Sequence, residues 1–181
     1  MTARWRGRTA GPAIVALAAL VAGASALAAC GAQRLASAPI RTDVTEWQLV
    51  VRGSDGEVLL RVPLVDGRFT LRYRNSVYES LAEERFAITP GGQIALVDLA
   101  ADEAAVLAEY YTAEGVRSAD PEDDRRWVAE PSASVELAEL PLAATEYGQR
   151  TLLVEGSEPV RLWLLVEAGE PTMTLAAEAA G

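Results

Sequence analysis

Polar residues able to bind a ligand or share a proton gather between two strand-like runs, within LRYRNSVYESLAEERF (71–86). The cluster consists of Asn75, Ser76, Tyr78, Ser80 and Glu84. Amide, hydroxyl and carboxylate groups of these types can bind a polar ligand, or can satisfy one another's hydrogen bonds inside a fold. Which of the two they do depends on the strands that position them.

The alternation of the flanking strands predicts that this cluster faces the core. Successive side chains of a strand point to opposite faces, so Asn75 continues the face that carries Leu71 and Tyr73. On the next strand, Glu84 has the same parity as Phe86. We therefore expect an amide and a carboxylate at adjacent ends of one apolar face. A carboxylate placed there needs donors, because an unpaired buried charge is costly.

The other members of the cluster are the expected donors to Glu84: the Asn75 amide, the hydroxyl of Ser76 or Ser80, and Tyr78. A second interpretation stays open. The cluster would then be a polar connection that closes a hairpin, with Glu84 turned to water. A bulge between residues 74 and 84 would also reverse the parity.

Three arginines, Arg68, Arg72 and Arg74, alternate with the apolar residues of the preceding strand. Residues i and i+2 stand about 6.5 Å apart on a strand, so Arg72 and Arg74 could grip one carboxylate-bearing ligand. The chain contains 26 acidic residues, which makes cross-strand ion pairing the expected use of these arginines.

Two further groups are candidates for binding. The loop ADPEDD (119–124) offers oxygens that suit Ca²⁺, but it lacks the glycine and distal glutamate of an EF-hand, so we expect a solvated loop and no metal site. Trp47, Trp127 and Trp163 could form a sugar platform, although Trp163 lies within LWLLV and is expected in the core.

The residue types that are absent exclude most enzyme chemistry. The chain has no His and no Lys. It therefore cannot build a Ser-His-Asp or Cys-His system, a His-ligated zinc site, a Schiff base or a P-loop. No pair of carboxylates is marked out as that of a glycosidase. The sequence predicts a protein that is not an enzyme and has no cofactor.

The N-terminus has the features of an export signal. Arg4, Arg6 and Arg8 precede an apolar run over 13–26, and Leu-Ala-Ala then leads to Cys30, the only cysteine. This pattern predicts a signal peptide over 1–29. The tetrapeptide resembles the lipobox of bacterial lipoproteins, which implies lipidation at Cys30. A plain signal peptide or an uncleaved anchor is the alternative.

The remaining chain divides into a tether, which with the lipidated cysteine spans 30–45, and one β-rich domain over 46–178. Three of the 16 arginines lie in the signal, so 13 remain against 26 acidic residues, a formal net charge of −13. Such a surface is repelled by nucleic acid and by anionic headgroups. We expect a protein held covalently by lipid at the extracytoplasmic side of the cell membrane, with no nucleic-acid partner.

Short alternating segments separated by turns predict an all-β fold. Nine segments fit a strand, and they are 46–52, 57–63, 68–74, 84–89, 93–99, 134–140, 150–156, 159–168 and 172–178. Turn sequences such as 53–56 and 90–92 separate them. We predict an antiparallel sandwich or partly closed barrel of about nine short strands, with one short helix near 101–111.

One motif points to a known family. YRNSVYESLAEERF (73–86) resembles the signature of the bacterial family called domain of unknown function 1850, which reads Tyr-x-His-Ser-Val, Ser/Thr-Pro-Val and Glu-x-aromatic. The matching residues are Tyr73, Ser76, Val77, Ser80, Glu84 and Phe86. The segment 140–166 resembles the closing strands of that family, and the resemblance covers about 46–178. It implies an association with TAXI-type tripartite ATP-independent periplasmic (TRAP) transporters, but no activity.

The departures from the family motif bear on function. Asn75 stands where the family has His, and Leu81-Ala82 stand where it has Pro-Val. A His beside Glu84 would titrate near neutral pH or bind a metal, whereas an Asn only donates and accepts hydrogen bonds. We predict a non-enzymatic lipoprotein that serves solute uptake, by contacting a TRAP-type permease or handling its solute. The alternative is an independent ligand-binding lipoprotein for a small anion, a sugar or Ca²⁺.

Overall fold

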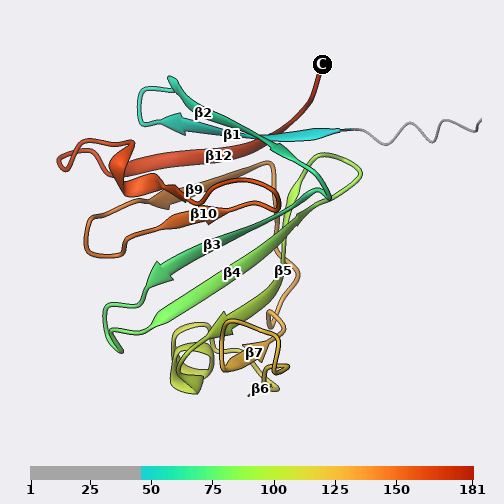
Figure 1. Ribbon diagram of the computed structural model, residues 1–181, viewed down its shortest axis with the longest axis vertical. Helices are drawn as coiled ribbons and strands as arrows, with labels where there is room; N and C mark the ends of the chain where they lie inside the picture. The colour runs from blue at the N-terminus through green and yellow to red at the C-terminus, as the bar shows by residue number, and fades with distance from the viewer. Residues whose placement is uncertain (1–45) are drawn as a thin grey trace, which may run out of the picture. The chain divides into compact units, whose positions relative to one another are not determined.

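The alternating segments of the N-terminal half form hairpins in the computed structural model, which describes residues 46–181 (Figure 1). The first hairpin joins β1 (Trp47–Gly53) to β2 (Val58–Leu64), and the turn between them contains Gly56 with φ +84°. Further hairpins join β3 (Arg68–Arg74), β4 (Leu81–Ile88) and β5 (Ile94–Ala101). The signal, Cys30 and the tether up to residue 45 lie outside the described residues.

The C-terminal half supplies shorter elements. They are η1 (Val106–Tyr110), β6 (Arg117–Ser118), β7 (Trp127–Ala129), β8 (Glu136–Leu137), β9 (Glu139–Ala143), β10 (Thr151–Leu153), β11 (Val160–Arg161), η2 (Leu162–Leu164) and β12 (Thr172–Ala179). One antiparallel sheet has the strand order β2-β1-β12-β9. The other has the order β11-β10-β3-β4-β5-β7-β6, and β8 also pairs with β5.

The prediction of an all-β antiparallel fold is confirmed, and the described residues form no closed barrel. The expected helix is a single π-helical turn, η1. Residues 46–181 form twelve strands rather than about nine, because the segment 134–140 is divided between β8 and β9, and β6 and β7 form where the sequence predicts no strand. The segment 159–168 is a strand only at Val160–Arg161 and then turns into η2, which buries Leu162 and leaves Leu164 exposed.

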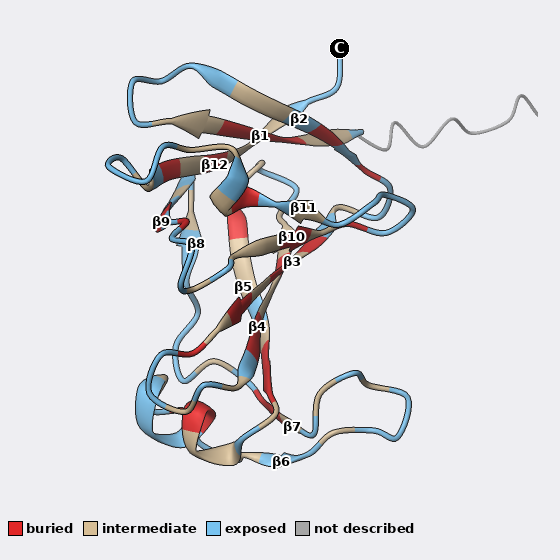
Figure 2. Ribbon diagram, turned by 60° about the vertical axis from the view of Figure 1, so that its left-hand side comes forward, coloured by how far each residue is buried: buried red, intermediate tan, exposed pale blue. Residues whose placement is uncertain are grey.

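The main core lies between the two sheets. Leu49 and Leu175 of the four-stranded sheet and Phe69, Leu71 and Phe86 of the other belong to one buried cluster. The Phe69 and Phe86 rings stack with centroids 5.0 Å apart. Figure 2 shows buried residues along the strands, while the connecting loops are mostly exposed. The cross-strand pair of Phe69 and Phe86 adds to the stabilisation that burial of apolar area alone provides.

A second, smaller core covers the far end of the eight-stranded sheet. There Tyr73, Ala82 and Leu99 pack against Val106 and Leu107 from η1. The helical turn is stabilised by burying these two residues, since five residues are too few for an independent helix.

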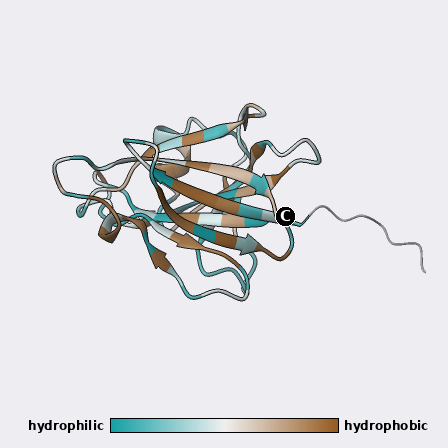
Figure 3. Ribbon diagram, turned by 90° about the horizontal axis from the view of Figure 1, so that it is seen from above, coloured by the Kyte–Doolittle hydropathy of each residue, from teal (hydrophilic) through white to brown (hydrophobic). Residues whose placement is uncertain are grey.

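Hydrophobic residues are concentrated on the strands, as the view from above shows (Figure 3). Among residues 46–181, no helix is both long and apolar enough to span a membrane.

The turn between β4 and β5 provides a test of this packing. Gly92 has φ +81°, and a Cβ added there would lie 2.8 Å from the Trp47 ring. We expect Gly92→Ala to lower the free energy of unfolding by about 3 kcal/mol, through backbone strain and overpacking. Gly56→Ala is the matched control. Gly56 has φ +84° but open space around it, so that variant should lose about 1 kcal/mol. Urea unfolding followed by tryptophan fluorescence measures both, and equal losses would contradict the role of the Trp47 contact.

Candidate functional site

Asn75 is buried at the end of β3, with 3% of its surface exposed. Its side-chain oxygen accepts hydrogen bonds from the backbone N–H groups of Val77 and Tyr78, both at 3.0 Å. The backbone N–H of Asn75 donates a hydrogen bond to the backbone carbonyl of Ser80 at 2.8 Å. Asn75 therefore faces inward, as parity predicts, and it shapes the loop between β3 and β4.

The expected donors from this loop do not reach Glu84. Tyr78 donates instead to Glu109 at 2.6 Å. The Ser80 hydroxyl is buried and has no hydrogen-bond partner among residues 46–181. The cluster predicted from residues 75–84 is thus divided: Asn75 satisfies its own turn, and Glu84 takes its partners from distant parts of the chain.

Glu84 lies on the inner face of β4, opposite Leu71 of β3. On the same face, Phe86 belongs to the main core and Ala82 to the second core, so the carboxylate sits at the boundary between them. One oxygen accepts a hydrogen bond from Tyr111 at 2.7 Å, and the other accepts one from Arg150 at 3.1 Å. Both partners are supplied by loops that close over the end of the sheet.

The hydrogen bonds at Glu84 form a directed chain. Tyr111 gives its single hydroxyl proton to Glu84, so Tyr73 is the donor in the 2.6 Å contact between the two tyrosines. Burial raises the pKa of Tyr73 to about 12. Burial and the nearby Glu84 charge also raise the pKa of Tyr111. Both phenols are therefore neutral donors at physiological pH.

Arg150 closes this network at the surface. Its guanidinium lies over the Tyr73 ring, 4.9 Å from the centroid, while it pairs with Glu84. It lines a hollow of about 230 Å³, here called the Arg150 pocket. The pocket is lined by Tyr73, Arg74, Asn75, Ser76, Tyr110, Ala143, Thr145, Tyr147, Gly148 and Arg150. Arg74 is its second cation, and it lies 5.5 Å above the Tyr147 ring.

Backbone strain occurs within three residues, along the chain, of residues that line this pocket. Three non-glycine residues in the described part of the chain have a left-handed backbone, and they are Glu79, Thr112 and Gln149. Thr112 directly follows Tyr111, and Gln149 directly precedes Arg150. A β-branched residue such as Thr rarely adopts this conformation. Strain of this kind persists where the surrounding structure fixes the backbone, often at a binding site.

The opposite face of β4 carries a second carboxylate network, centred on Glu83. Glu83 is 3% exposed. Its oxygens lie 2.8 Å from Arg72, 2.8 Å from Arg85 and 3.5 Å from Arg125. Because three guanidiniums surround it, this carboxylate is compensated although it is removed from water.

The acidic loop forms part of this network. Asp123 pairs with Arg85 at 2.7 Å, and Asp124 pairs with Arg72 at 3.2 Å. Hydrogen bonding to Arg85 lowers the pKa of Asp123. The expectation of a solvated loop is therefore wrong for Asp123, which is 16% exposed and ion-paired over the sheet, whereas Asp124 is 75% exposed and stays solvated, as expected. Residues 46–181 contain no group of three or more carboxylates that could hold a metal ion.

All three arginines of the stripe form ion pairs, but the expected cross-strand pairing occurs only between Arg72 and Glu83. Arg74 pairs with Glu79 of the following loop at 3.4 Å, and Arg68 pairs with Asp66 of the preceding turn at 3.9 Å. Only Arg74 of the three lines the Arg150 pocket. Arg72 and Arg74 therefore do not form the shared carboxylate grip that their spacing allows.

The three tryptophans do not act as one platform. Trp47 packs against Gly92, and Trp127 packs against the second core. Trp163 packs against the main core, as expected, but it also lines a separate hollow beside the Arg150 pocket.

Several residues of the two networks are not predicted from the sequence, for different reasons. Glu83 and Arg85 occupy outward positions of β4, and the register of the β3–β4 hairpin places Glu83 opposite Arg72, so strand alternation could have predicted this ion pair. No sequence pattern links Tyr111 or Arg150 to Glu84. They lie 27 and 66 residues from Glu84 in sequence, and only the tertiary fold brings them to its carboxylate.

Comparisons with family models, curated proteins and solved structures return no significant match. The fold and site define an all-β protein with an arginine- and tyrosine-lined pocket. Its resemblance to domain of unknown function 1850 stays a prediction.

The Glu83 network predicts a large cost for removing the central charge. We expect Glu83→Gln to lower the free energy of unfolding by about 3–5 kcal/mol, because it leaves three arginines around a neutral side chain. Asp124→Asn is the control. The Asp124 side chain is 75% exposed, so its loss should cost less than about 1 kcal/mol. Urea unfolding near pH 7 compares them, and a Glu83→Gln loss as small as that of the control would refute the central role of Glu83.

The buried phenols predict a decline of stability at alkaline pH. Above the ordinary tyrosine pKa of 10.0, the unfolded chain releases the Tyr73 proton, but the native protein keeps it until the pKa of about 12. The native state then binds more protons, so stability falls with rising pH, by up to about 1.4 kcal/mol per pH unit for each such phenol. Tyr73→Phe should make the slope between pH 10 and 12 shallower. The same slope in both proteins would show that Tyr73 ionises equally in the two states.

Proposed function

We propose that this chain is a lipid-anchored extracytoplasmic protein without enzymatic activity, which serves solute uptake by binding a small carboxylate in the Arg150 pocket. The observation that carries the proposal is the arrangement of Arg150. This guanidinium is fixed in position at the pocket, and most of its hydrogen-bonding capacity is unused within the described residues.

The donor inventory of Arg150 supports an anionic ligand. A guanidinium has five N–H donors. Within residues 46–181, Glu84 is the only hydrogen-bond acceptor of Arg150. The remaining donors can bind a ligand carboxylate in the paired geometry that favours Arg. Glu84 and the Tyr73 ring hold the side chain, which lowers the entropy cost of binding.

The rest of the pocket favours a small organic acid. Arg74, which also pairs with Glu79, is a second guanidinium at the pocket, and three further lining residues carry hydroxyl groups: Tyr110, Thr145 and Tyr147. The volume of about 230 Å³ lies below the range of about 300–1,000 Å³ that is usual for drug-sized ligands. A compact ligand with one or two carboxylates matches this size and charge.

The membrane and uptake parts of the proposal rest on the sequence. The lipobox-like segment ending at Cys30 supports export and anchoring, and the absence of His and Lys supports a binding role over catalysis. The resemblance to domain of unknown function 1850 supports a link to a TRAP-type permease. The same pocket would equally serve an independent ligand-binding lipoprotein, which is the second candidate.

We expect small carboxylates to stabilise the wild-type protein against heat and to fail to stabilise Arg150→Gln. A ligand at 100 times its Kd adds about 2.7 kcal/mol to the stability of the state that binds it. Arg68→Gln is the matched control, because Arg68 is 65% exposed and does not line the pocket. A panel of mono- and dicarboxylates screened by thermal unfolding tests this. Equal stabilisation of Arg150→Gln and wild type would refute the proposed site.

Crosslinking in native membranes separates the two candidate functions. We expect a permease subunit, identified by mass spectrometry, to be crosslinked to the wild-type protein and recovered with it. A soluble Cys30→Ala form should recover no permease subunit. Carboxylate binding without any recovered permease would favour the independent ligand-binding lipoprotein.

A further inference from the structure

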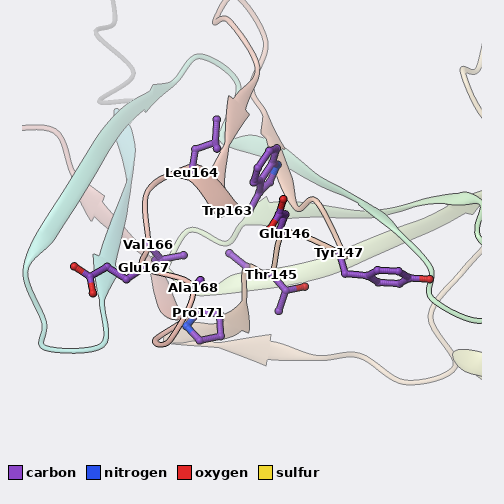
Figure 4. Close-up of a pocket in the computed structure, with 10 residues that line it drawn as sticks. Thr145, Glu146, Tyr147, Trp163, Leu164, Val166, Glu167, Ala168 and Pro171 are labelled. Atoms are coloured by element: carbon purple, nitrogen blue, oxygen red, sulfur yellow. The ribbon is translucent and has the colours of Figure 1, made fainter.

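The Arg150 pocket has a larger hollow beside it, of about 640 Å³ (Figure 4). The two share Thr145 and Tyr147. A further hollow, of about 260 Å³, shares Val166 and Glu167 with the 640 Å³ hollow. The hollows of about 640 Å³ and 260 Å³ together are here called the loop-end groove, and the segment 163–171 runs along both.

The floor of the loop-end groove is apolar and partly exposed. Trp163 and Val166 pack against the main core from one side and line the groove from the other. Leu164 is 60% exposed and Tyr147 is 51% exposed on its edges. Figure 4 shows these side chains spread along the hollow, with Tyr147 at one extreme and Glu167 at the other. Such a surface favours contact with apolar side chains.

Acidic residues that line the same groove have no ion-pair partner in the described part of the chain. They are Asp55, Glu57, Glu146, Glu167 and Glu170. None of the five forms an ion pair within residues 46–181. This differs from β4, where both Glu83 and Glu84 are paired with arginines. The groove therefore presents uncompensated negative charge next to an apolar floor.

We propose that the loop-end groove binds an extended basic segment of a partner protein, in which Lys or Arg alternates with apolar residues. The negative charge of the loop-end groove favours a cationic partner, and the Trp163 ring can stack against a cationic side chain. The apolar floor accommodates the alternate side chains of an extended chain. The two hollows share Val166 and Glu167, so an extended chain could reach both, whereas a compact ligand would fill only one. This inference goes beyond the proposed function, because it concerns a neighbouring groove and a macromolecular partner.

The test measures binding of a fluorescent peptide to the full chain in detergent. The probe is the blocked peptide Leu-Lys-Val-Lys-Leu-Lys-Val, and the reference probe has Glu in place of each Lys. We expect the basic peptide to bind and the acidic one not to bind. The double variant Glu146→Gln/Glu167→Gln and the single variant Trp163→Ala should each weaken binding by about tenfold or more.

A charge-matched control separates specific binding from general attraction to an acidic protein. Glu114→Gln/Glu130→Gln removes two exposed charges outside the groove, and it should leave the peptide affinity unchanged. Equal weakening by both double variants would overturn the proposal. Competition by the polyamine spermine at the affinity of the peptide would also overturn it, in favour of a compact cation.

The Arg150→Gln variant distinguishes this inference from the proposed function. Because Arg150 lies outside the loop-end groove, this variant should bind the peptide like wild type while it loses carboxylate stabilisation. If the wild-type protein binds carboxylates but not the basic peptide, the groove proposal is refuted and the proposed function stands.

Discussion

The structure depends on compensating two consecutive carboxylates of the central strand β4, Glu83 and Glu84. A strand directs neighbouring side chains to opposite faces, so these two charges enter two different environments. Glu83 is surrounded by arginines beneath an acidic loop, and Glu84 lies between two apolar cores with one arginine and one tyrosine. Each charge requires partners from outside β4, so each fixes a loop against the sheet.

The two networks have different consequences. Around Glu83, the arginines themselves bind further carboxylates such as Asp123, so that network is closed within the protein. Around Glu84, the network ends at Arg150, whose guanidinium lines a pocket. The same physical requirement therefore produces a structural cover on one face and a pre-organised cation on the other. This is why the candidate site lies at Glu84, although Glu83 is the more buried charge.

The end of the sheets gathers features that stability alone does not require. Strained residues lie near the Arg150 pocket in sequence, and carboxylates without an ion pair among residues 46–181 line the neighbouring groove. Exposed aromatic and aliphatic side chains such as Tyr147 and Leu164 lie along the same edge. On the four-stranded sheet, by contrast, Glu178 of β12 is paired with both Arg52 and Arg61. Loops at one end of a rigid sheet scaffold are where binding residues are usually placed.

The sequence by itself determined the all-β class, the hairpins and the inward placement of Asn75, because period-2 alternation and turn residues act locally. It also contained the Glu83–Arg72 pairing, which follows from the register of one hairpin. Only the tertiary structure decided the partners of Glu84 and the existence of the pocket. Tyr111 and Arg150 come from loops distant in sequence, and their positions follow from how η1 and the β9–β10 connection pack onto the sheet. Side-chain alternation specifies the face on which a residue lies, whereas the contacts across that face depend on packing of the whole chain.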